Sequence, residues 1–147
     1  MRSDDRGETL IELLVALTIL SIALVAVIGA LAASITMSDV HRKQSTAGAE
    51  VRNYAEQVEN YTAGTGYAAC ALPSAYAAAT VGYAAPAGYS ATPSAIRYWT
   101  GSAWSTSCPA TDTGLQQLTL AVRSTDTRAV EQLVLVLRKP CGAGSTC

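Results

Sequence analysis

The chain has 147 residues, of which half are hydrophobic and 14% are charged, and its formal net charge is −1. This length allows one small domain beside a membrane helix, and the charged fraction is below the quarter that is usual for soluble domains. From residue 62 onward, five Lys and Arg residues face three Asp and Glu residues. So slight an excess gives no convincing signal for a nucleic-acid partner.

The first predicted element is a membrane helix. Its start, residues 7–17, reads Gly-Glu-Thr-Leu-Ile-Glu-Leu-Leu-Val-Ala-Leu, and the apolar run extends over residues 10–35. This run is long enough to cross a bilayer and too long for the apolar core of an ordinary secretory signal peptide. Its one acidic residue is Glu12. Because a carboxylate in a membrane span costs about 2.5 to 3.5 kcal/mol on insertion scales, we expect Glu12 to have a partner and a function.

Residues 7–17 closely resemble the amino-terminal signature of type IV prepilins and of the pseudopilins of type II secretion systems. In that family a prepilin peptidase cuts after the glycine that ends a short leader, and the new terminal amine is usually N-methylated. The resemblance implies cleavage between Gly7 and Glu8, N-methylation of Glu8, and a role in filament assembly for Glu12. Glu12 stands at the fifth mature position, where the family has its glutamate. Glu8 departs from the Phe or Met that the family most often has after the cut.

The helical pattern continues beyond the apolar run as one apolar face with alternating steps of three and four residues. This face consists of Met37, Val40, Gln44, Ala47, Val51, Tyr54, Val58 and Tyr61. No proline interrupts residues 8–61. We therefore predict a leader (residues 1–7) and one long helix with a membrane half (residues 8–36) and an amphipathic half (residues 37–61).

Residues 62–95 are predicted to form a connecting loop that is rich in Ala, Tyr and Gly and has no charged residue. Two interpretations stay open. The segment is either a long, loosely packed connection or a surface loop whose tyrosines contact neighbouring subunits or an external partner.

A β-sheet region with a cysteine-containing tail is predicted for residues 96–147. Residues 96–100 and 103–106 flank a Gly-Ser turn, while residues 115–123 and 130–138 alternate between apolar and polar positions. A small antiparallel sheet packed on the amphipathic half of the helix would cover the apolar face of that helix. The predicted fold class is therefore α+β, which also matches what the pilin resemblance implies.

Four cysteines follow the span, which favours disulfides in an oxidising exterior. They allow three pairings. We favour Cys141–Cys147, because both lie in a Gly-rich tail, and this leaves Cys70–Cys108. Zinc binding is disfavoured, because no Cys-x-x-Cys spacing occurs and the only histidine, His41, is far away in the sequence. We predict no metal and no cofactor.

No catalytic residues are predicted, because His41 has no nucleophile and carboxylate arranged around it in the sequence. The predicted function is that of a structural subunit, a minor pilin or pseudopilin, of a type IV pilus-like or type II secretion filament. Its partners would be prepilin peptidase, other subunits through the amino-terminal helix, and membrane lipid. The leader would be cytoplasmic and the carboxy-terminal domain extracytoplasmic, in the inner membrane before assembly and in a cell-surface or envelope filament after it.

Two alternatives belong to other classes of protein. The first is a single-pass, membrane-anchored binding module that does not polymerise. The second is a secreted enzyme that an ordinary signal peptidase releases near Ser34. Each predicts a different mature amino terminus.

Overall fold

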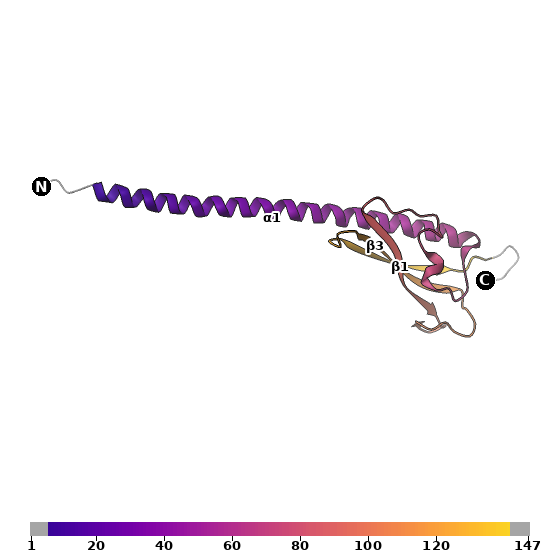
Figure 1. The fold of residues 1–147 in the computed structure, drawn as a ribbon. Coiled ribbons are helices and arrows are strands. Elements are labelled where there is room, and N and C mark those ends of the chain that lie inside the picture. Colours follow the sequence, from indigo (N-terminus) through magenta and orange to yellow (C-terminus); the bar gives the residue numbers. More distant parts are fainter. Residues whose placement is uncertain (1–5, 142–147) are drawn as a thin grey trace. The chain divides into compact units, whose positions relative to one another are not determined.

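The computed structural model describes residues 6–141, with side chains from residue 10 onward (Figure 1). The chain divides into two compact units, Met1–Asp39 and Val40–Cys147, and helix α1 (Arg6–Tyr61) contributes to both. Each unit is considered separately below.

In the first unit, the described residues form only helix. Its large apolar side chains are exposed on all sides, as for Leu13, Ile22 and Val25. The hydroxyl groups of Thr18, Ser21 and Thr36 donate hydrogen bonds to backbone carbonyls three or four residues earlier. These bonds satisfy the polar side chains within the helix, which suits a surrounding that offers no hydrogen-bond partners.

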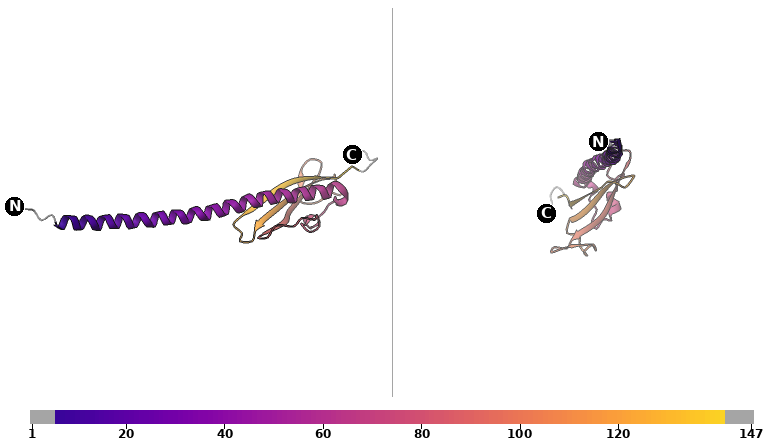
Figure 2. Two further views of the ribbon diagram at one scale, coloured as in Figure 1. Left: turned by 90° about the horizontal axis from the view of Figure 1, so that it is seen from above. Right: turned by 90° about the vertical axis from the view of Figure 1, so that its left-hand side faces the viewer.

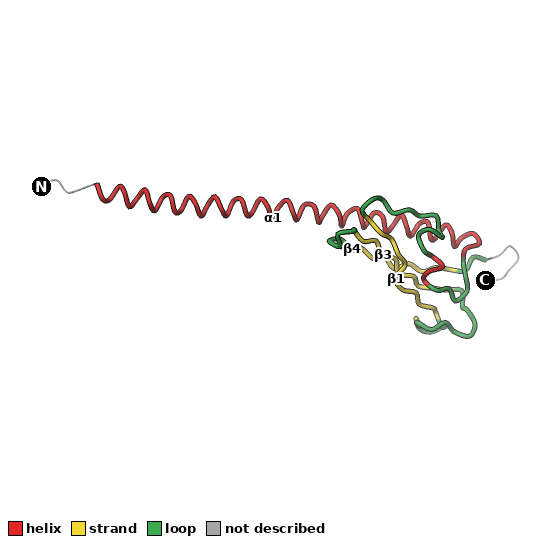
Figure 3. The backbone as a smooth tube through the Cα atoms, viewed as in Figure 1, coloured by secondary structure: helices red, strands yellow, loops and turns green. Residues whose placement is uncertain are grey.

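The second unit combines the later part of α1 with a four-stranded antiparallel sheet in the order β2-β1-β3-β4 (Figure 3). The strands are β1 (Tyr89–Trp99), β2 (Trp104–Ser105), β3 (Leu115–Ser124) and β4 (Val130–Arg138). The α+β fold class predicted from the sequence is confirmed.

The core of this unit lies between α1 and one face of the sheet (Figure 2). The helix contributes Ala47, Val51, Tyr54 and Val58, and the strands contribute a second buried set: Ile96, Tyr98, Leu118, Leu120, Val122, Leu135 and Leu137. These strand residues are spaced by two, as expected for one face of a pleated sheet. The middle part of the predicted apolar face, from Ala47 to Val58, is therefore buried as expected.

The ends of that predicted face are wrong. Met37 is 65% exposed and Tyr61 is 36% exposed. Within the second unit, the helix residues of the buried core begin at Ala47 and end at Val58, so Tyr61 lies beyond them.

Strand β1 begins at Tyr89 and not at residue 96, so the predicted connecting loop is shorter than expected. The additional strand residues read Tyr-Ser-Ala-Thr-Pro-Ser-Ala and lack a regular alternation of large apolar and polar side chains. The pairing of β1 with β3 shifts register between Pro93 and Ala95. Since proline has no amide donor, it is tolerated in a strand at such an irregularity. A proline also argues against a strand when only the sequence is read, so the start of β1 was not predicted.

The turn between β3 and β4 is attached to α1 by an ion pair. Lys43 Nζ lies 2.6 Å from Asp126 Oδ2, and Ser124 Oγ donates to Asp126 Oδ1 at 2.7 Å. The hydrogen bond from Lys43, followed by that from Ser124, lowers the pKa of Asp126. The two partners are 83 positions apart in the chain, so no local sequence pattern identifies this contact.

Candidate functional site

Glu12 lies on the exposed surface of α1, within its apolar segment. Its neighbours Leu10, Ile11, Leu13 and Leu14 are all more than half exposed. No hydrogen bond or ion pair joins Glu12 to another described residue. One carboxylate therefore stands alone on an apolar helix surface, as the sequence indicated.

The backbone of Gly7 and Glu8 belongs to the first turns of α1. Their side chains lie outside the described set, so the cleavage and methylation assigned to them stay predictions. Sequence spacing places Glu8 four residues before Glu12, on the same face of a helix.

The apolar segment is long enough to cross a membrane, and none of its most hydrophobic window is buried inside the protein. A core helix of a soluble protein would be mostly covered by other parts of its chain. This segment therefore needs either lipid or other helices around it.

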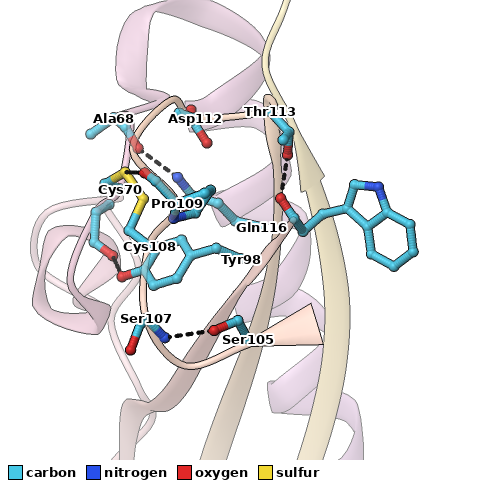
Figure 4. Close-up of a disulfide and its surroundings, with 12 residues drawn as sticks. Ala68, Cys70, Tyr98, Ser105, Ser107, Cys108, Pro109, Asp112, Thr113 and Gln116 are labelled. Carbon is cyan, nitrogen blue, oxygen red and sulfur yellow. Dashed lines mark hydrogen bonds between the residues drawn. A yellow bond between two sulfur atoms is a disulfide. The ribbon is translucent and has the colours of Figure 1, made fainter. Parts of the chain in front are cut away.

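A disulfide joins Cys70 and Cys108, with their Cα atoms 5.6 Å apart (Figure 4). Cys70 has a φ of +53°, a conformation that is uncommon for residues other than glycine. The bond ties the segment after the helix to the segment between β2 and β3. The other favoured pair, Cys141–Cys147, involves residue 147, which lies outside the described residues, so that pairing stays a prediction.

A buried hydrogen-bond network surrounds this disulfide. Tyr76 donates from its hydroxyl to Gln116 Oε1 at 3.2 Å, and Gln116 Nε2 donates to the carbonyl of Ala68 at 2.8 Å. Tyr98 donates to the carbonyl of Ala71 at 2.7 Å. Figure 4 shows Gln116 reaching Ala68 beside the disulfide. The network fixes the segment after the helix onto the inner face of the sheet.

Tyrosines from the neutral segment also pack against α1. Tyr54 of the helix donates to the carbonyl of Tyr76 at 2.6 Å, and its ring stacks on that of Tyr83 at a centroid distance of 4.9 Å. Tyr83 in turn donates to Glu50 Oε2 at 2.7 Å. Burial raises the pKa of Tyr54 to about 12, and burial followed by the hydrogen bond to Glu50 raises that of Tyr83.

The segment over residues 62–95 was predicted to be either a loosely packed connection or a surface loop with outward-facing tyrosines, and neither description fits Tyr76 and Tyr83. Tyr76 is fully buried and Tyr83 is half-buried, so the connection is packed and its tyrosines point inward. It includes two short helical turns, η1 (Thr62–Gly66) and η2 (Pro73–Tyr76).

Two polar residues of this network were missed by sequence reasoning. Gln116 is fully buried, and the alternation that places Leu118 and Leu120 inward could have identified it. Asp112 accepts a hydrogen bond from the hydroxyl of Tyr67 at 2.9 Å. That contact crosses 45 positions of sequence, and no local pattern reports it.

Comparison with known proteins gives one match. Residues 2–28 fit the family model described as the prokaryotic N-terminal methylation motif, which is the signature of type IV pilins and pseudopilins. No curated protein and no solved structure matches the chain. The resemblance inferred from residues 7–17 is thus confirmed, and the motif with its apolar helix supports a membrane-anchored precursor of the pilin or pseudopilin type.

Proposed function

We propose that this protein is a filament subunit, a minor pilin or pseudopilin, that prepilin peptidase processes between Gly7 and Glu8. The observation that carries the proposal is the coincidence of the methylation motif at residues 2–28 with an apolar helix that the described chain leaves uncovered. Proteins with this signature have a structural role and not an enzymatic one.

The proposed assembly follows from the cost of an unpaired carboxylate in lipid. Before assembly, Glu12 has no described partner on its helix. In a filament, the terminal amine that cleavage creates on Glu8 of a neighbouring subunit would pair with Glu12, and the apolar helices would pack against one another. An ion pair in an apolar medium is stronger than in water, so both changes favour the filament.

A minor role is proposed because Glu8 carries its own carboxylate beside the new amine. That carboxylate competes for the amine with Glu12 of a neighbour and so weakens repeated pairing. Such a subunit suits a sparse or terminal position better than the body of a fibre.

Substitution of Glu12 tests the assembly mechanism. We expect Glu12→Ala and Glu12→Gln to be cleaved normally but to be incorporated into sheared filaments at least tenfold less than the original chain. Thr18→Val is the matched control, because Thr18 is exposed on the same helix and its hydroxyl bonds only the carbonyl of Val15. Normal incorporation of both Glu12 variants would refute the role of the carboxylate.

A further inference from the structure

One face of the four-stranded sheet is turned away from α1 and from the buried core. The core residues of the strands, such as Tyr98 and Leu118, point toward the helix. Because successive side chains of a strand alternate between faces, their neighbours point to the opposite side, which we call the outer sheet face. None of the buried hydrophobic residues that the structure describes on the strands lies on the outer sheet face.

Three arginines lie on the outer sheet face, one on each long strand. They are Arg97 on β1, Arg123 on β3 and Arg138 on β4, and all are exposed. No outward position of the four described strands carries Asp, Glu or Lys. No salt bridge joins these arginines to a described residue. The outer sheet face is therefore positively charged without internal compensation, and this field attracts anions.

The same face carries Trp99 and Trp104, the only two tryptophans of the chain. They are partners across the β1–β2 pair, with ring centroids 5.4 Å apart and an angle of 61° between the rings. Such a pair stabilises a hairpin. Both residues nevertheless remain partly exposed, so that aromatic surface is available at the end of the arginine-bearing face.

We propose that the outer sheet face binds single-stranded nucleic acid, with the arginines on phosphate groups and a tryptophan stacked on a base. An open sheet face suits this ligand because an unpaired strand offers negative charge and flat, accessible bases together. A duplex offers the charge but keeps its bases stacked inside. The remaining outward positions are short hydroxyl, amide and aliphatic side chains, which leave the face accessible.

The grouping of the three arginines on one face is visible only in the structure. Net charge gave no nucleic-acid signal, and the three arginines are far apart in the chain. Strand pairing brings them onto one face: Arg97 of β1 lies opposite Gln117 of β3, and Arg138 of β4 lies opposite Leu115 of β3. Arg97 and Arg138 are therefore near the end of the face that carries the tryptophans, and Arg123 is near the other end of β3. This inference concerns a separate surface and does not depend on the proposed filament role.

Titration of the full chain in a nonionic detergent with an oligodeoxythymidine of about 20 nucleotides tests the proposal. Tryptophan fluorescence is the readout, because both tryptophans lie on the outer sheet face. We expect saturable quenching. Three phosphate contacts on a single strand predict a log–log salt slope of about −2, so that affinity falls about 20-fold between 50 and 200 mM salt.

Single substitutions localise the binding. Arg97→Gln, Arg123→Gln and Arg138→Gln should each lower affinity severalfold and make the salt slope shallower by about 0.7. All three side chains are exposed, so folding should persist, which circular dichroism checks. Arg52→Gln is the matched control, because Arg52 is exposed on α1, and it should leave both quantities unchanged.

Three results would overturn the proposal. The first is that the oligonucleotide does not quench tryptophan fluorescence. This result would overturn the proposal even if an anionic peptide such as polyglutamate binds the outer sheet face. The second is that heparin binds with the same affinity as the oligonucleotide and that neither ligand changes the tryptophan fluorescence. This result would indicate that the face attracts any polyanion. The third is a loss of binding in Arg52→Gln as large as that in the outer-face variants.

Discussion

Tyr76 and Gln116 show how a small domain accommodates buried polar groups. Both side chains are fully buried, and each satisfies the other while also bonding the backbone of Ala68. A buried polar atom that loses its partner costs more free energy than a hydrogen bond contributes on average. These residues therefore act as fixed anchors for the segment between helix and sheet.

Removal of one hydroxyl tests this anchor. We expect Tyr76→Phe to lower the free energy of unfolding by about 1 to 3 kcal/mol, because it leaves Gln116 Oε1 buried without its donor. Tyr89→Phe should change it by no more than about 0.5 kcal/mol, since no hydrogen bond from the Tyr89 hydroxyl is described. Urea unfolding monitored by tryptophan fluorescence measures both. Equal effects of the two substitutions would argue against a special role for Tyr76.

Tyr54 predicts a dependence of stability on alkaline pH. Burial raises its pKa to about 12, above the value of about 10 in an unfolded chain. Its contribution to stability is therefore fully present below pH 10 and is lost as the pH rises through about 12. Absorbance at 295 nm should show a fraction of the tyrosines ionising only as circular dichroism reports unfolding. Ionisation of every tyrosine near pH 10 with the fold intact would contradict this.

At the scale of elements, predictability follows the strength of local patterning. The predicted strand over residues 130–138 is confirmed as β4, because this segment alternates clearly between its two faces. The start of β1 was missed because its first residues lack that pattern. The packing of residues 67–83 was missed because it depends on contacts with α1 and β3, which no window of sequence contains.

The Cys70–Cys108 bond is the covalent restraint on this connection. It closes a separation of 38 residues, for which the chain-entropy model gives about 4 kcal/mol. We expect Cys70→Ser to lower the free energy of unfolding by about 2 to 4 kcal/mol. Cys147→Ser should be better tolerated, because the predicted Cys141–Cys147 ring is short.

Urea unfolding of the two variants, together with non-reducing peptide mapping, checks this order. A peptide linking Cys70 to Cys147 would show that the predicted pairing is wrong. Greater destabilisation by Cys147→Ser than by Cys70→Ser would contradict the expected ranking.

At the scale of the whole molecule, the amino-terminal motif could be predicted from sequence and the outer sheet face could not. Glu12 is identifiable because its charge interrupts one continuous apolar run. Arg97, Arg123 and Arg138 become a group only through strand pairing, which depends on the fold of the second unit. The amino-terminal motif and the domain surface are thus separate sources of functional information.

The mature amino terminus tests the central claim most directly. Mass spectrometry of the protein from its native membrane should find a chain that begins at Glu8 and carries a methyl group on its terminal amine. A chain that begins at Met1 would indicate a membrane anchor that prepilin peptidase does not process. A chain that begins near Ser34 would indicate an ordinary secreted protein, and either result would contradict the filament-subunit account.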